Sequence, residues 1–170
     1  MSTDHQPKAQ AGRTNGASKG EPPAVPALRR LVPGDAAAQA EVEAACLGSE
    51  AWPEHICREV LEQSYAFYVG AFDGTQLIGT AGLQNLGGDG EISNVAVVPA
   101  YRRGHIADRL LQALLSEGAA QGIRNFTLEV RAMNAPAIGL YEKSGFRTEG
   151  RRPHFYTAPD DDALIMWKRI

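Results

Sequence analysis

The period of the hydrophobic and polar positions changes repeatedly after residue 26, between short strand-like and longer helix-like segments. Apolar residues between Ile106 and Leu115 fall on one face of a helix, which makes this the clearest helical segment. Two strand-like runs meet at Asp73-Gly74, a dipeptide typical of tight hairpins. Strands are predicted at 28–32, 66–72, 76–86, 91–98, 125–130, 146–152 and 163–169, and helices at 33–46, 52–63, 106–121 and 134–144.

The last predicted helix has clear boundary signals. Asn134 can cap it, Pro136 fits its first turn, and Gly145 follows its end. The element order is therefore β-α-α-β-β-β-α-β-α-β-β. This order predicts an α/β fold, with a single mixed and mostly antiparallel sheet flanked by helices.

The first 26 residues differ from the rest in composition. Residues 1–26 are rich in Ser, Gly, Pro, Ala, Gln and Lys and contain almost no large apolar side chains. Such a segment cannot bury enough surface to offset the entropy of ordering. We therefore predict a flexible N-terminal tail over 1–26 and one folded domain over 27–170.

Composition excludes several classes of protein. The formal net charge of -3 argues against a direct nucleic-acid binder, because such proteins usually carry a basic surplus. No apolar run approaches the length of a membrane span, and the N-terminus lacks the apolar centre of a signal peptide. A cytoplasmic protein without a membrane partner is expected.

The segment 94–111 is the first that carries chemistry. A strand is followed by a short loop with Arg102, Arg103 and Gly104, and the loop opens directly into the amphipathic helix. Helix N-termini expose unpaired N–H groups that suit a pyrophosphate, and the two arginines add positive charge. No Gly-Lys-Ser/Thr follows, and only one glycine is present, so neither a P-loop nor a dinucleotide fingerprint fits. From geometry alone, a plain scaffold remains an alternative.

This segment resembles the acetyl-CoA-binding motif of the GNAT acetyltransferases, V-x-P-x-x-[QR]-x-x-G-x-[GA]. Val97, Pro99, Arg102 and Ala107 match the motif, while His105 stands where the family usually has glycine. If that position needs a positive φ, a histidine there is strained. If the position is already helical, its side chain points outward, and this second conformation is the one we expect.

A second segment, L-E-V-R-A-M-N-A-P-A-I-G-L-Y-E-K-S-G-F over 128–146, extends the resemblance. Together with R-R-P-H-F-Y and D-A-L-I-M, it is similar to the RimI branch of that superfamily, the ribosomal-protein alanine N-acetyltransferases. The resemblance covers 27–170 and implies Glu129 as the general base and Tyr141 as the general acid. It further implies that the Val95 amide binds the thioester carbonyl. The acetyl-CoA residues it implies are Val95, Ala96, Val97, Arg102, Arg103, Gly104, His105, Ile106, Ala107, Asp108 and Asn134.

The implied substrate is a protein N-terminus, in particular the N-terminal alanine of a small-subunit ribosomal protein. An α-amine is about 10–20% neutral at pH 7, whereas a lysine is neutral in only about 0.04% of molecules. One carboxylate, acting directly or through a water, therefore suffices as the base. The alternatives are an acetyltransferase for lysine or a small-molecule amine, and a non-catalytic acyl-CoA-binding module.

Each of these residues also has a purely structural interpretation. Glu129 could be a solvated strand residue, and Tyr141 a core aromatic. Trp52 and Tyr156 could form the walls of a substrate groove or merely pack. His105 and His154 have no matching partners in the sequence, so no metal site is expected.

Overall fold

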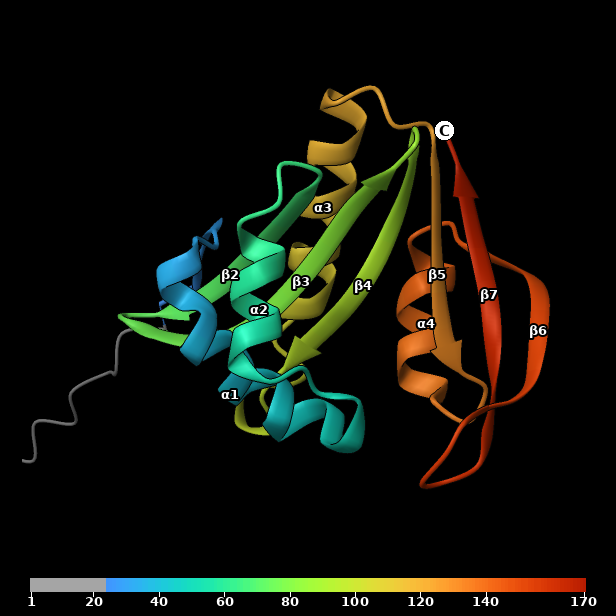
Figure 1. Ribbon diagram of the computed structural model, residues 1–170, viewed down its shortest axis with the longest axis horizontal. Coiled ribbons are helices and arrows are strands. Elements are labelled where there is room, and N and C mark those ends of the chain that lie inside the picture. Colours follow the sequence, from blue (N-terminus) through green and yellow to red (C-terminus); the bar gives the residue numbers. More distant parts are fainter. Residues whose placement is uncertain (1–23) are drawn as a thin grey trace, which may run out of the picture.

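Seven strands form one sheet (Figure 1): β1 (Ala27–Arg30), β2 (Ala66–Asp73), β3 (Gln76–Leu86), β4 (Asp89–Val97), β5 (Asn125–Arg131), β6 (Arg147–Tyr156) and β7 (Asp161–Arg169). Their order across the sheet is β1-β2-β3-β4-β5-β7-β6. Among these described strands only β4 and β5 pair in parallel, so the predicted mixed, mostly antiparallel sheet is confirmed. This computed structural model describes residues 24–170, and residues 1–23 of the predicted tail lie outside the described residues.

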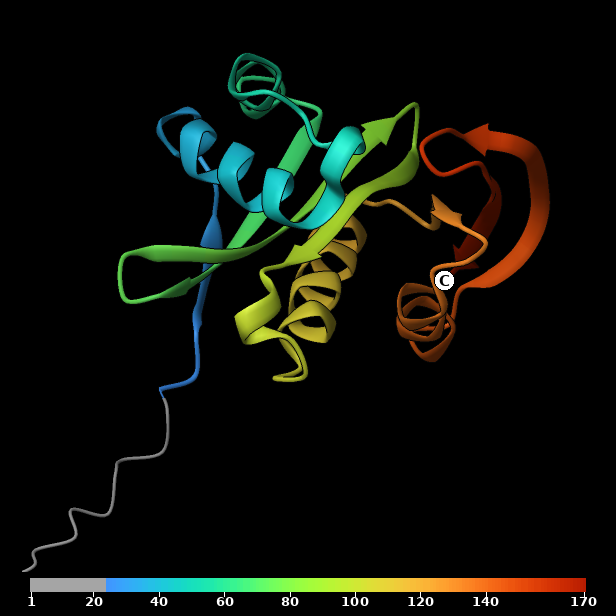
Figure 2. The ribbon, with the colours of Figure 1, turned by 90° about the horizontal axis from the view of Figure 1, so that it is seen from below.

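The two faces of the sheet are covered by α1 (Ala36–Leu47), α2 (Glu54–Leu61), α3 (Ile106–Ala120) and α4 (Ala135–Lys143). Figure 2 shows α1 and α2 over one face and α3 and α4 over the other. A separate buried cluster lies under each layer, the larger one on the side of α3 and α4. The element order agrees with the order predicted from the sequence. None of the helices within 24–170 has the length and apolar character needed to cross a bilayer.

The apolar face predicted for α3 is buried against the sheet. Leu110, Leu111 and Leu114 are fully buried and pack with Phe126 of β5. Gly118 lets the helix approach closely, because a Cβ there would lie 2.5 Å from the Phe126 ring. The helix is thus fixed tightly to the strands whose ends carry the candidate chemistry.

The last hairpin is longer than the sequence prediction. We predicted that its first strand ends at residue 152, but β6 continues to Tyr156. The pairing with β7 is irregular between Arg152 and Tyr156, which accommodates Pro153 and its missing N–H on this edge strand. His154 donates its backbone N–H to the Asp162 carboxylate at 2.9 Å, which supports the irregular segment.

The sheet opens between β4 and β5. Their pairing covers only Asp89–Glu91 opposite 125–127, after which the strands diverge (Figure 1). The cause lies in β4, where Ser93 and Asn94 bulge opposite Gly82 of β3. Ser93 Oγ accepts hydrogen bonds from Tyr68 Oη at 3.1 Å and from the Gln84 amide at 3.3 Å. These bonds fix the bulge and therefore the opening.

Candidate active site

A cavity of about 340 Å³ occupies the opening between the diverging ends of β4 and β5. Side chains reach it from both faces of the sheet, because neither strand covers the gap. Its lining comes from the end of α1 and the turn after it, from β4 and β5, and from α4 and β6: Leu47, Glu50, Glu91, Ile92, Ser93, Asn94, Val95, Thr127, Leu128, Glu129, Val130, Arg131, Tyr141 and Tyr156.

Glu129 enters the cavity because of strand alternation. Its neighbours Leu128 and Val130 are buried in the core cluster on the side of α3 and α4, so Glu129 points to the opposite face. Its side chain is 32% exposed, and Oε1 lies 3.2 Å from a guanidinium nitrogen of Arg152 on β6. The carboxylate therefore lies at the cavity with a cation beside it.

Tyr141 reaches the same cavity from α4. It is 7% exposed and packs edge-on against Phe146, with 5.9 Å between the ring centroids. Burial, with Tyr156 nearby, raises the pKa of the Tyr141 phenol to about 12. Among the described residues its hydroxyl has no hydrogen-bond partner, yet it is not a fully buried atom. Tyr141 is thus both a core aromatic and a neutral donor at the cavity.

The main chain of β4 supplies another donor. The Val98 amide donates to the Ile78 carbonyl of β3 at 2.9 Å. Amide directions alternate along a strand, so Ala96 also faces β3 while Val95 and Val97 face away from it, toward β5. Val95 lines the cavity, and its N–H is therefore directed into the opening.

The start of α3 differs from our expectation for His105. We expected a helical residue there, which is wrong: His105 has φ of 57° and forms the N-cap in the left-handed region. Arg103 also has a positive φ, 69°. Both residues turn the chain sharply so that α3 begins at Ile106. The N-cap side chain accepts no hydrogen bond from the helix, and the first amides of α3 remain without a side-chain cap.

The side chains around this helix start are partly committed to other contacts. Arg102 Nε donates to the Val97 carbonyl at 2.9 Å, which braces the loop against β4. Asp108 lies 3.0 Å from Lys143 Nζ of α4 and 3.4 Å from His105 Nδ1. The Lys143 and His105 hydrogen bonds lower the pKa of the Asp108 carboxyl. Ile106 is a core residue, and only its main chain is available to a ligand.

Asn134 has the capping role that its position predicted. Its Oδ1 accepts a hydrogen bond from the Ala137 amide at 3.2 Å, at the first turn of α4. The side-chain NH₂ is not used by that bond. The predicted contact of Asn134 with acetyl-CoA stays a prediction.

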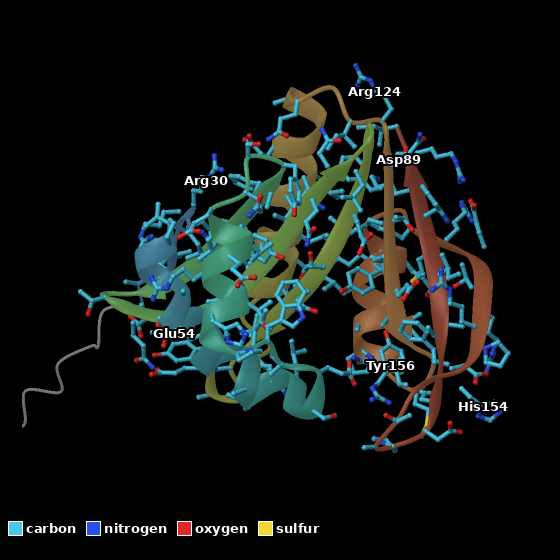
Figure 3. All side chains as sticks on the ribbon, in the orientation of Figure 1. Arg30, Glu54, Asp89, Arg124, His154 and Tyr156 are labelled. Carbon is cyan, nitrogen blue, oxygen red and sulfur yellow. The ribbon has the colours of Figure 1, made fainter. Side chains whose placement is uncertain are left out.

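The two aromatic residues predicted for the substrate groove line different hollows. Tyr156 lines the cavity, and Figure 3 shows it on the inner side of the β6–β7 hairpin, with His154 on the outer side. Burial and the nearby Glu50 and Glu129 raise the pKa of Tyr156 to about 12. Trp52 instead packs against the cluster under α1 and α2 and lines a surface groove along α1. Its role with substrate stays a prediction.

Glu50 and Arg131 line the cavity and Arg152 pairs with Glu129, but the sequence analysis assigned none of them to the site. Arg131 and Arg152 both lie within segments quoted for the family resemblance, and strand alternation places Arg131 on the same face as Glu129. That spacing could have identified Arg131. Glu50 lies in the turn after α1, where no periodic pattern marks it. Within 24–170, no three His, Cys, Asp or Glu side chains converge as metal ligands would.

Known proteins with similar sequences are named as acetyltransferases. The Acetyltransferase (GNAT) family matches residues 37–146. A Bacillus subtilis protein, provisionally named as a ribosomal protein bS18-alanine N-acetyltransferase, is 35% identical over 76% of this chain and 86% of its own length. The N-alpha-acetyltransferase RimI of Mycobacterium tuberculosis is 36% identical over 86% of this chain and 92% of its own.

A solved structure extends the agreement to three dimensions. The crystal structure of the ribosomal-protein-S18-alanine N-acetyltransferase from Escherichia coli superposes with a TM-score of 0.78 at 28% identity. The match covers 85% of this chain and 94% of that one. The opened sheet, the free start of α3 and these similarities agree: the chain is an acetyltransferase and belongs to the GNAT family.

Proposed function

We propose that this chain transfers an acetyl group from acetyl-CoA to the α-amine of a protein N-terminus, with Glu129 as the base. The observation that supports the proposal is that Glu129, Tyr141 and Val95 all line one cavity. A carboxylate, a phenol and a main-chain N–H can accelerate direct transfer as a base, a donor for the leaving sulfur and a donor for the oxyanion.

The acceptor amine must be neutral when it attacks the thioester carbon. Glu129 accepts the amine proton, directly or through one water, and Arg152 beside it can pair with the carboxylate until the acceptor arrives. An α-amine needs little help because its pKa lies close to neutral pH. As the amine attacks, the carbonyl oxygen gains negative charge, which the Val95 N–H stabilises.

Tyr141 acts on the leaving thiolate as the C–S bond breaks. With a pKa of about 12 against roughly 8.5 for a thiol, full proton transfer from the phenol costs on the order of 5 kcal/mol. Tyr141 therefore serves as a hydrogen-bond donor that stabilises the thiolate. The final proton on sulfur comes from the amine through the base or from solvent.

The start of α3 suits the diphosphate of acetyl-CoA. Its first amides have no side-chain cap, and the left-handed residues Arg103 and His105 direct the chain around that point. Gly104 between them and Ala107 in the first turn are small. The main-chain N–H groups of Val95 and Val97, which face away from β3, can then bind the pantetheine arm, while Ala96 between them pairs with Thr80 of β3.

The names of the relatives favour an N-terminal alanine of a ribosomal protein as the acceptor. A test compares three acceptors at equal concentration with acetyl-CoA: an Ala-starting peptide, an N-acetylated peptide with one lysine, and a polyamine. Thiol release gives the rate, and mass spectrometry locates the acetyl group. We expect the first peptide to react fastest, at its α-amine. Preference for lysine or polyamine would contradict the N-terminal assignment, and acetyl-CoA binding without turnover would contradict an enzyme.

Glu129→Gln tests the base within the same assay. Loss of a general base typically reduces turnover by about 10²- to 10⁴-fold. We expect a fall in that range, with acetyl-CoA affinity by calorimetry unchanged, because the start of α3 is untouched. Unaltered turnover at every pH would remove Glu129 as the base.

A further inference from the structure

The Arg131 side chain joins three separate segments of the chain. It leaves the end of β5 and is 18% exposed. Its Nε donates to Glu50 Oε1 at 2.7 Å, in the short 3-10 helix Gly48–Glu50 between α1 and α2. Nη1 donates to the Pro159 carbonyl at 2.9 Å and Nη2 to the Thr157 carbonyl at 3.4 Å, both in the turn between β6 and β7. The guanidinium also stacks on Tyr156, 4.4 Å from the ring centroid.

Two of these segments, the turn after α1 and the end of the β6–β7 hairpin, form the walls of the cavity beyond the point where β4 and β5 separate. Glu50 lines the wall that follows α1, and Tyr156 lines the wall made by β6. The parallel ladder between β4 and β5 ends at Glu91 and Thr127, so strand pairing does not join the walls there. Arg131 spans that unpaired region, on the same face of β5 as Glu129.

A guanidinium is suited to this position for geometric reasons. It presents five N–H donors in a fixed plane, so it can hold a carboxylate, two carbonyls and an aromatic ring at the same time. A lysine has one nitrogen and cannot occupy all these places. The Arg131 side chain is 18% exposed and the Glu50 side chain 38%, so the ion pair is partly open to solvent and salt should weaken it.

We propose that Arg131 is a positioning residue for the acceptor: by tying Glu50 to the β6–β7 turn and Tyr156, it fixes the width of the groove that leads to Glu129. This inference rests on the proposed function. Acetyl-CoA approaches by α3 and β4, which Arg131 does not contact. Its loss should therefore weaken acceptor binding selectively.

The test compares Arg131→Lys and Glu50→Gln with Arg151→Lys in the full chain. Arg151 is a matched control, since it also lies near the end of the hairpin and pairs with a carboxylate, Asp162, at 2.6 Å, but outside the cavity. We expect Arg131→Lys to raise the KM for the Ala-starting peptide by about ten-fold or more. The acetyl-CoA dissociation constant should stay within about two-fold and kcat should change less than KM. Glu50→Gln should act in the same direction, and the double variant should cost less than the two effects combined. Arg151→Lys should change none of these.

An unchanged peptide KM in Arg131→Lys overturns the proposal. An equal loss of acetyl-CoA affinity and melting temperature does so too, since it indicates a general structural role. If the wild-type protein acetylates no peptide, the proposed function fails. Hydrogen exchange then tests whether Arg131 ties the two walls of the cavity together. Faster exchange at both 48–52 and 157–161 in Arg131→Lys supports the tie between the walls, and unchanged exchange overturns it.

Discussion

Tyr141 and Glu129 reach the same cavity from opposite faces of the sheet. Tyr141 is packed as a core residue, yet its hydroxyl reaches the opening between β4 and β5. Glu129 leaves the opposite face of the sheet and meets the same opening. Glu129 and Tyr141 come from two faces of the sheet and reach one cavity because the sheet is split at this point.

The first substitution to test is one that removes only the hydroxyl of Tyr141. Tyr141→Phe keeps the ring and its packing on Phe146, so the melting temperature should change little. We expect turnover to fall by about 10²-fold, because the leaving thiolate loses its donor. The raised pKa, about 12, keeps the phenol protonated throughout the working range. The wild-type pH profile should therefore rise as the amine deprotonates and show no fall below about pH 10 caused by Tyr141. A tyrosine-dependent fall near pH 8, absent in Tyr141→Phe, would contradict this assignment.

His105 offers a test of backbone strain. Its φ of 57° lies in the left-handed region, which costs a residue with a Cβ about 1–2 kcal/mol. His105→Gly and His105→Ala both remove the imidazole, but only glycine adopts this conformation freely. We expect the glycine variant to be more stable than the alanine variant by about 1 kcal/mol in urea unfolding. Equal stabilities would mean that the N-cap conformation is not left-handed in solution.

The sequence predicted the position of His105 in the motif but not its backbone conformation. Local pattern places residue 105 beside the first apolar position of α3, and a helical φ fits that pattern equally well. The choice is made by the path of the chain from β4 through Pro99 and Arg103 into the helix, which is a tertiary constraint. Arg131 and Glu50 were missed for a similar reason: their pairing joins positions 81 residues apart.

At the scale of elements, the periodic segments were predictable and the irregular ones were not. The apolar face of α3 and the Asn134 cap of α4 are local signals, and the structure confirms both. The extension of β6 beyond Pro153 depends on Asp162 across the hairpin, which no local pattern contains. The bulge at Ser93 likewise depends on Tyr68 of β2 and Gln84 of β3.

Asn134 can be tested for both of its roles at once. Asn134→Ala removes the cap of α4 and should cost about 1 kcal/mol of unfolding free energy, whereas Asn134→Ser should keep most of it. Both variants lose the amide NH₂ that is predicted to contact acetyl-CoA. We therefore expect similar losses of acetyl-CoA affinity in calorimetry but different stabilities in denaturant. An unchanged affinity in the serine variant would leave Asn134 with the capping role alone.

At the scale of the whole molecule, α1, α2 and β1 to β4 lie on one side of the opening, and α4 and β5 to β7 on the other (Figure 1). In the sheet they are joined by the short pairing of β4 with β5, where the Asn125 amide also donates to Asp89 at 2.9 Å. A ligand that fills the opening should hold the two sides together.

Acetyl-CoA should therefore stabilise the protein in a localised way. At a concentration about 100 times its dissociation constant, it should add roughly 2.7 kcal/mol to the unfolding free energy. Hydrogen exchange should slow most at 94–97 and 103–108 and least in β1, which lies at the far edge of the sheet. A uniform slowing across the sheet, or none at β4, would contradict binding at the proposed place.

The bulge at Ser93 and Asn94 has a consequence for inherited or engineered change. If acetyl-CoA is bound along β4 by main-chain amides, as we propose, most replacements of outward side chains there should leave its binding intact. A substitution that breaks the hydrogen bond between Tyr68 and Ser93 should abolish the bulge. The parallel pairing of β4 with β5 should then extend past Glu91. Activity would then be lost through closure of the gap itself, in a protein that is well folded and retains its carboxylate, its phenol and its arginines.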